Sequence, residues 1–178
     1  MQNQGILITS DPYSKIIDPK DKSTALLFGD AATATLISDK PKYKILNSVF
    51  NTDGSNLNAL IKKNGKFKMD GRKVFNFSAI EVPKQIYKLL KLSNISIDDI
   101  DLFIFHQGSR FIVETISKRL KLDINKTPIN IKNFGNTVSS SIPLVLESYL
   151  NDNLDRIVLS GFGVGLSWGS IILERYNE

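Results

Sequence analysis

Short apolar runs alternate with segments of helical spacing along most of the chain. In its first third, the continuous run at residues 5–9 is typical of a buried strand. The runs at residues 24–28, 31–37 and 44–50 predict three further strands. Residues 51–56 are rich in Asn, Asp, Gly and Ser, so we expect a loop there.

A long helical pattern follows Asp70, a residue type that commonly caps helix N-termini. Its apolar positions mostly follow helical spacing and are Val74, Phe77, Ile80, Ile86, Leu89 and Leu90. Pro83 interrupts the pattern. Because proline lacks a backbone N–H and clashes with the preceding turn, we expect two helical pieces rather than one.

The last 80 residues repeat the strand-then-helix order. The run at 102–105 predicts a fully buried strand that leads into a helix with Ile112, Ile116 and Leu120 on one stripe. Further strands are predicted at 128–131, 156–159 and 170–174, and a further helix at 138–150. This alternation predicts an α/β layered fold with a mostly buried sheet.

The composition narrows the class of protein. With 178 residues, 42% of them hydrophobic, the chain is long enough for one compact domain. No apolar run approaches the roughly 18 residues that span a bilayer, and the first residues lack the features of a signal peptide, so we expect a cytoplasmic protein and no membrane partner. With no cysteine and one histidine, the sequence contains no metal-ligand spacing, and we expect no metal.

The net charge of +5 raises the question of nucleic acid. The lysines are spread along the chain, and the densest stretch, residues 62–73, has Phe67 as its one aromatic for base stacking. We therefore expect no nucleic-acid partner. A diffuse positive surface also suits an acidic protein or a phosphorylated ligand, although a solvated lysine-rich face explains it as well.

Three segments place polar groups at the ends of apolar runs. They are His106 after the strand at 102–105, Asn136 between Gly135 and Thr137, and the glycine-rich stretch 161–169. Each alone has an ordinary explanation, as a core histidine, a capping asparagine or a plain hairpin. Together they are the groups with which an acyl-transfer site holds a developing oxyanion or enolate.

Two nucleotide-binding motifs fail on spacing. The third glycine of the dinucleotide fingerprint would fall at Leu166, and the sequence ends too soon after it for the helix and acidic residue that complete the motif. The phosphate-loop pattern around Lys66 has Leu60 in place of its first glycine. We therefore interpret the stretch at 161–169 as a tight turn that can offer a backbone N–H to a ligand.

Four ordered segments resemble the C-terminal half of β-ketoacyl-acyl-carrier-protein synthase III, in the thiolase-like superfamily. Residues 18–32 resemble the family's D-P-x-D-R and F-G-D-G-A segments, and residues 106–107 its H-Q motif. Residues 135–143 are similar to G-N-T-x-x-x-S-x-P, and residues 161–169 to the closing F-G-G-G-x-x-W-G. The resemblance implies a thiolase-like layered α/β/α fold.

In that family a Cys-His-Asn triad catalyses a decarboxylative Claisen condensation of an acyl thioester with malonyl carrier protein. The resemblance places the histidine at His106 and the asparagine at Asn136, where both would donate N–H groups to the enolate oxygen. It also implies that the backbone N–H of Val164 contributes to the oxyanion hole. Acyl-CoA or acyl carrier protein would be the substrates, and no cofactor is implied.

The resemblance further implies a set of basic contacts. Lys22 corresponds to an arginine that stacks on adenine of coenzyme A, and Lys118 and Arg119 match positions that meet the acidic carrier protein. The arginine that follows the H-Q motif in the family corresponds to Phe111 here, with Arg110 adjacent. We therefore expect Lys22, Arg110, Lys118 and Arg119 to bind carrier protein or coenzyme A.

The family's nucleophilic cysteine lies before the segment that resembles residues 5–9. We therefore expect this chain to lack condensing activity alone, with residues 1–38 as the tail of the N-terminal half and residues 39–178 as the C-terminal domain. The expected partners are acyl carrier protein, the missing cysteine-bearing half, and a second copy in a homodimer.

Two alternatives remain open. The first is a non-catalytic thiolase-like half that pairs with another subunit or docks carrier protein. The second, weaker one is another thiolase-like enzyme, of the hydroxymethylglutaryl-coenzyme A or chalcone synthase type.

Overall fold

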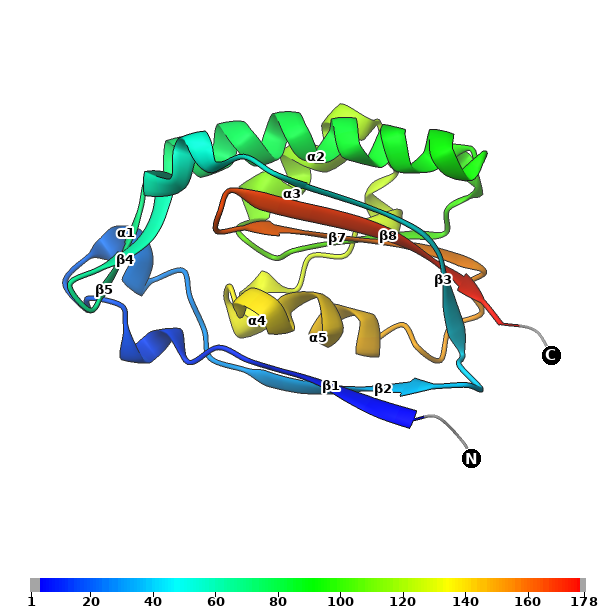
Figure 1. Cartoon of the computed structure of the whole chain (residues 1–178), viewed down its shortest axis with the longest axis horizontal. Coiled ribbons are helices and arrows are strands. Elements are labelled where there is room, and N and C mark those ends of the chain that lie inside the picture. Colours follow the sequence, from blue (N-terminus) through cyan, green and yellow to red (C-terminus); the bar gives the residue numbers. More distant parts are fainter. Residues whose placement is uncertain (1–3, 177–178) are drawn as a thin grey trace.

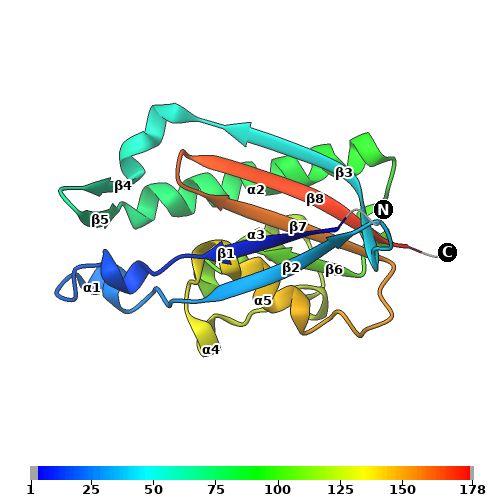
Figure 2. The same cartoon turned by 60° about the horizontal axis from the view of Figure 1, so that its bottom comes forward.

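The computed structural model describes residues 4–176 and arranges them in layers (Figure 1). Helices α2 (Gly71–Ser93) and α3 (Arg110–Leu120) cover one face of a four-stranded sheet. Helix α5 (Ser141–Glu147) covers the other face. Beyond α5 lies a separate antiparallel ribbon of β1 (Gln4–Ser10) and β2 (Ala32–Ser38), which Figure 2 shows from below.

The four-stranded sheet has the order β3-β8-β7-β6, with bounds Tyr43–Thr52, Ser167–Arg175, Arg156–Gly163 and Leu102–Phe105. Strands β6 and β7 are parallel, and the other two pairs are antiparallel. Every residue of β6 is buried, as its continuous apolar pattern predicts. Because β6 and β7 run in the same direction, the residues that follow both strands meet at one edge of the sheet.

Shorter elements complete the chain. They are α1 (Lys22–Ala25), β4 (Leu60–Lys63), β5 (Lys66–Met69), α4 (Ile131–Phe134) and 3-10 turns at Tyr13–Lys15, Gly54–Ala59, Ile97–Asp99, Ile124–Lys126 and Val138–Ser140. The β4–β5 hairpin and α1 lie at the same end of the molecule in both views.

The predicted α/β layers and most predicted strands are confirmed. The N-terminal strand is present, but its expected burial is wrong, because Ile6 and Ile8 are 68% and 69% exposed on the ribbon. The strand predicted at 24–28 is also wrong. Asp21 accepts a hydrogen bond from the Ser23 backbone N–H and starts the short helix α1 instead.

The prediction that Pro83 divides the helix is wrong, since α2 runs without a break from Gly71 to Ser93. Proline removes one backbone donor, whereas the helix buries Val82, Ile86 and Leu89 completely against the sheet and α3. Burial of one large aliphatic side chain contributes about 1.5–3 kcal/mol, so the packed face outweighs the lost hydrogen bond. Asp70 caps this helix as predicted, accepting from the Lys73 backbone N–H at 3.1 Å.

The strand predicted at 128–131 does not form. The Gln107 side chain bonds this backbone itself, accepting from Asn130 N–H at 3.0 Å and donating to the Pro128 carbonyl at 3.4 Å. A buried amide side chain therefore satisfies the groups that a neighbouring strand would otherwise satisfy.

Candidate active site

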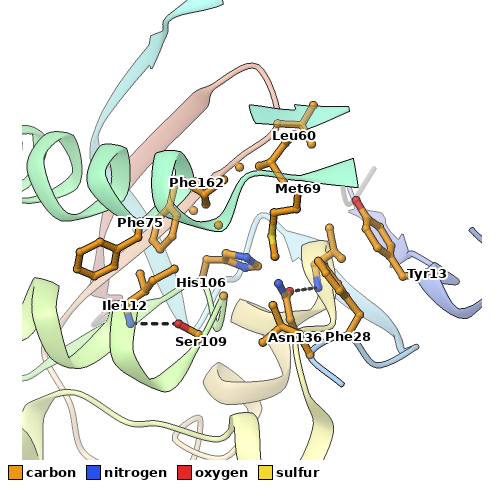
Figure 3. A pocket seen from close by; sticks show the side chains of 18 of the residues that line it. Tyr13, Phe28, Leu60, Met69, Phe75, His106, Ser109, Ile112, Asn136 and Phe162 are labelled. Atoms are coloured by element: carbon orange, nitrogen blue, oxygen red, sulfur yellow. Dashed lines mark hydrogen bonds between the residues drawn. The ribbon is translucent and has the colours of Figure 1, made fainter. Parts of the chain in front are cut away.

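A cavity of about 620 Å³ opens where the ends of β6 and β7 meet the loop before α5 (Figure 3). Its walls are mainly apolar and come from distant parts of the sequence. Leu60, Phe67 and Met69 belong to the β4–β5 hairpin, Phe28 precedes β2, and Phe162 lies in β7. Such a lining, with a few polar groups, is typical of ligand pockets.

His106 lies directly after β6 and lines this cavity. Its backbone N–H continues the sheet by donating to the Ser160 carbonyl at 2.8 Å, and its ring packs edge-on against Phe162. The Nδ1 atom lies 2.7 Å from the Ser141 hydroxyl. Burial lowers the pKa of the His106 imidazole to about 4, although the Val138 carbonyl partly opposes this shift. The ring is therefore neutral at pH 7.

Asn136 lines the same cavity and is itself buried. Its backbone is tied to the N-terminal segment, donating to the Leu27 carbonyl at 2.8 Å and accepting from the Gly29 N–H at 3.0 Å. Its side-chain Oδ1 accepts from the Val138 backbone N–H at 3.0 Å. Because the Val138 N–H is a donor and only the oxygen of the Asn136 amide can accept, the amide orientation is determined, and Nδ2 is the atom left to donate.

The backbone of residues 27–29 crosses that of residues 134–136 in close contact, and each segment needs a glycine at this crossing. A Cβ added at Gly29 would collide with the Phe134 carbonyl oxygen, and one at Gly135 would lie 3.0 Å from the Leu27 carbonyl oxygen. Gly135 also has φ +70°, a backbone conformation that side chains disfavour. Close backbone approach is therefore what brings Asn136 into the cavity.

Val138 connects the two polar side chains. Its φ of 52° is unusual for a β-branched residue and indicates local strain. In this conformation its N–H bonds Asn136, and its carbonyl accepts from the Ser141 hydroxyl at 2.9 Å. Ser141 in turn contacts His106. One strained residue thus orients both candidate side chains.

The remaining predicted site residues fall into two groups. Val164 lies in the turn between β7 and β8 and lines the cavity together with His106 and Asn136. Lys22, Arg110, Lys118 and Arg119 are exposed and do not line it.

The positions of these four basic residues differ. Lys22 is the first residue of α1, and Arg110 begins α3 with its guanidinium 2.7 Å from Glu114. Lys118 and Arg119 lie in the last turn of α3. The structure therefore brings three of the seven residues into one site and leaves the four cations on the surface.

The sequence does not by itself indicate two further parts of the site. Ser141 lies within the motif at residues 135–143 and contacts His106, but its residue type alone indicates no role. The β4–β5 hairpin was missed although Asn64 and Gly65 form the two-residue turn that most strongly indicates a hairpin, both with positive φ. This dipeptide indicates that Phe67 belongs to a strand, and Phe67 lies in β5.

Two absences apply to residues 4–176. None of their helices is both long and apolar enough to cross a membrane. Within the same range, no cluster of three or more His, Asp or Glu side chains is arranged to hold a metal ion.

Two models of one protein family match this chain. The family model described as 3-oxoacyl-[acyl-carrier-protein (ACP)] synthase III C terminal matches residues 90–175, and the model described as 3-oxoacyl-[acyl-carrier-protein (ACP)] synthase III matches residues 2–54. The chain is 39% identical over 174 residues to the β-ketoacyl-[acyl-carrier-protein] synthase III of Acholeplasma laidlawii, covering 95% of the chain and 55% of that protein. It is 37% identical over 190 residues to the Streptococcus agalactiae protein of the same name, covering 96% and 59%.

Solved structures show the same fold. The 3-oxoacyl-[acyl-carrier-protein] synthase III of Aquifex aeolicus superposes with a TM-score of 0.91 at 28% identity, covering 97% of this chain and 58% of that one. A second 3-oxoacyl-(acyl-carrier-protein) synthase III superposes with a TM-score of 0.89 at 34% identity, covering 97% and 60%. The layered fold is thus the thiolase-like one. The chain spans between 55% and 60% of the length of these relatives.

Proposed function

We propose that this chain, which belongs to the 3-oxoacyl-[acyl-carrier-protein] synthase III family, forms the His-Asn part of a site for decarboxylative condensation of an acyl thioester with malonyl carrier protein. The observation that carries the proposal is the meeting of His106 and Asn136 in one apolar cavity. They lie 30 positions apart in the sequence and reach the cavity from different elements.

The chemistry of the cavity suits this reaction. Loss of carbon dioxide from a malonyl thioester leaves an enolate, whose negative oxygen needs hydrogen-bond donors held in place beforehand. The Asn136 Nδ2 donor is such a group, because its partner Oδ1 is fixed by Val138. The His106 ring, held by Ser141, is the second group that acts on the thioester. The apolar walls would exclude water from the reacting carbon.

The oxyanion hole of the acyl-transfer step would include the backbone N–H of Val164, at the cavity wall. The surface cations Lys22, Arg110, Lys118 and Arg119 would contact the acidic carrier protein or the coenzyme A phosphates outside the cavity.

The reaction also needs a nucleophile, and the 178 residues contain no cysteine. We propose that the cysteine comes from the N-terminal half of the family's fold, so this chain by itself does not condense. In this arrangement residues 1–38 complete that half and residues 39–178 form the C-terminal domain. The separation of the β1–β2 ribbon from the main sheet supports this division. The complete enzyme would be a homodimer that uses acyl carrier protein.

The test is a chimera that joins the N-terminal half of the Acholeplasma laidlawii relative to this chain. With an acyl-CoA and malonyl carrier protein, the chimera should form 3-oxoacyl carrier protein, and the 178-residue chain alone should form none. Asn136→Asp keeps the oxygen that Val138 binds but removes the Nδ2 donor, so turnover should fall about 100- to 1,000-fold.

His106→Ala in the chimera should abolish the formation of 3-oxoacyl carrier protein, because the ring that acts on the thioester is lost. Lys40→Ala, on an exposed loop remote from the cavity, is the matched control and should retain full turnover. Turnover by the unmodified 178-residue chain would contradict the missing-nucleophile part of the proposal. Carrier-protein binding and cysteine acylation without any decarboxylation in the chimera would favour the non-catalytic scaffold.

A further inference from the structure

The hydroxyl of Ser141, the first residue of α5, lies among three polar groups. Its Oγ is 2.7 Å from His106 Nδ1, 2.9 Å from the Val138 carbonyl oxygen and 3.4 Å from the Gln107 backbone nitrogen. Ser141 is 2% exposed, so water does not compete for these contacts.

The protons available to the Ser141 hydroxyl and its three neighbours determine which atom donates in each contact. A serine hydroxyl has one proton to donate and two lone pairs to accept with. The Val138 carbonyl can only accept and therefore takes the Ser141 proton, whereas the Gln107 N–H can only donate. The one arrangement that satisfies all three contacts has His106 donating from Nδ1–H to the second lone pair of Oγ.

The opposite arrangement leaves a repulsive contact. If Nδ1 had no proton, the Ser141 hydroxyl would donate to it, and the Ser141 and Val138 oxygens would face each other at 2.9 Å without a hydrogen between them. Two oxygen lone pairs at that distance repel each other in a buried site, and the hydrogen bond from the Ser141 hydroxyl to the Val138 carbonyl is lost. The Val138 carbonyl is also the backbone group that favours a proton on the His106 ring.

We propose that Ser141 is a positioning residue that holds neutral His106 in the tautomer protonated at Nδ1, so that Nε2 presents a lone pair to the cavity. No protein partner reaches Nε2 among residues 4–176, and Nε2 is not among their buried unpaired atoms. Gly108 keeps the space beside it open, since a Cβ there would lie 3.5 Å from Nε2.

This tautomer assigns different chemical roles to His106 and Asn136, and the assignment rests on the proposed function. A lone pair at Nε2 can take the proton of a thiol nucleophile as its sulfur attacks the acyl thioester carbonyl. When the tetrahedral intermediate collapses, the C–S bond of the substrate thioester breaks. The departing substrate thiolate takes the proton from Nε2, and the ring is neutral again. Asn136 Nδ2 is then the side chain that donates to oxygen throughout. Donation from His106 to the enolate oxygen, as the family resemblance implies, would require the other tautomer.

The experiment uses the fact that His106 is the one histidine of the sequence. In the ¹⁵N-labelled chain at pH 7, a long-range ¹H–¹⁵N correlation spectrum therefore shows a single imidazole. We expect a pyrrole-like shift for Nδ1 and a pyridine-like shift for Nε2. A pyrrole-like Nε2 would overturn the proposal. This measurement needs neither substrate nor cysteine, so its failure leaves the proposed condensation standing, and an inactive chimera leaves the tautomer assignment standing.

Variants separate a positioning role from a purely structural one. Ser141→Ala removes the acceptor, so the protonated fraction at Nε2 should rise, whereas Ser141→Thr keeps the hydroxyl and the native spectrum. Ser139→Ala is the matched control, because the Ser139 hydroxyl bonds Asp11 and not His106. An unchanged spectrum in a folded Ser141→Ala variant would defeat the idea. Should that variant not fold, the wild-type spectrum alone decides between the two tautomers.

Discussion

At the scale of single residues, the candidate site depends on two side chains that each have two polar atoms. One of these atoms makes a hydrogen bond within the protein, and the other faces the cavity. Asn136 uses Oδ1 on Val138, and His106 uses Nδ1 on Ser141. Each therefore has one nitrogen left for a ligand, in a fixed orientation. Preorganisation of this kind is what makes a donor or acceptor effective in a transition state, because no reorientation is required at the moment of reaction.

The lowered pKa of His106 predicts a pH dependence of stability. An unfolded histidine takes up a proton below about pH 6.5, whereas folded His106 stays neutral down to its pKa of about 4. The unfolded state therefore binds more protons within this range, and stability should fall as the pH drops from about 6.5 to 4. The loss due to His106 should reach at most about 3 kcal/mol.

Urea unfolding at several pH values measures this loss. The control is His106→Gln, which cannot titrate and should lack this part of the slope. Carboxylates with lowered pKa, such as Asp18, lose their stabilising contacts mainly at lower pH and do so in both proteins. Parallel curves for the two proteins between pH 6.5 and 4 would contradict the buried neutral state.

At the scale of elements, helix α2 and the Gly29–Gly135 crossing build opposite walls of the cavity. Val74 and Phe75 of α2 line one side, and Leu27, Phe28 and Asn136 line the other. The wall formed by α2 depends on a long packed helix with a defined start. The wall formed at the Gly29–Gly135 crossing depends on two backbones that touch without side chains between them.

The Asp70 cap should determine the stability of the first turn of α2. Asp70→Ala leaves the Lys73 backbone N–H without its partner and should lower the free energy of unfolding by about 1 kcal/mol. Asp70→Asn retains a capping oxygen and should stay within a few tenths of a kcal/mol of the parent. Chemical denaturation compares the two, and equal stability of the Ala and Asn variants would show that the cap is not used.

The glycine crossing should tolerate no side chain. Gly29→Ala places a methyl group against the Phe134 carbonyl and should cost about 3 kcal/mol or displace Asn136 from the cavity. Gly54→Ala, where an added Cβ meets nothing within 4 Å, is the control and should leave stability nearly unchanged. Thermal unfolding and the condensation rate of the chimera measure the two effects. Full stability and activity of Gly29→Ala would rule out the close approach.

At the scale of the whole molecule, the buried core and the exposed apolar surface lie in different places. The main core lies between the sheet and helices α2 and α3. The β1–β2 ribbon, in contrast, exposes Ile6, Ile8 and Leu36 to more than 60%. Apolar strands left open in this way favour association with another chain.

We therefore expect the isolated chain to self-associate through the ribbon. Sedimentation velocity should show species larger than a monomer, and Ile6→Lys with Ile8→Lys should shift the population towards the monomer. Ile124→Lys is the control, because Ile124 is 60% exposed but lies on a short turn away from the ribbon. The interface assignment would be wrong if both sets of substitutions had the same effect, or if the parent were monomeric throughout.

Several helices and strands of this protein can be predicted from the local pattern of apolar and capping residues. The continuous apolar run at 102–105 predicts β6, the spacing of Ile112, Ile116 and Leu120 predicts α3, and Asp70 marks the start of α2. These predictions succeed because the causes, periodicity and capping, act between residues a few positions apart. The short motifs around His106 and Asn136 likewise indicate which side chains to examine.

The tertiary structure decided the rest. Pro83 stays within one helix because the packed face of α2 compensates for a missing hydrogen bond. The bond between Ser141 and His106 depends on how the end of β6 and the start of α5 come together, and the position of Asn136 depends on its backbone bonds to Leu27 and Gly29. Pairing across more than 30 positions depends on the summed packing of whole layers, and no periodicity in the sequence encodes it. For this reason the sequence indicates the residues of the site, whereas only the folded chain determines which of their atoms face the cavity.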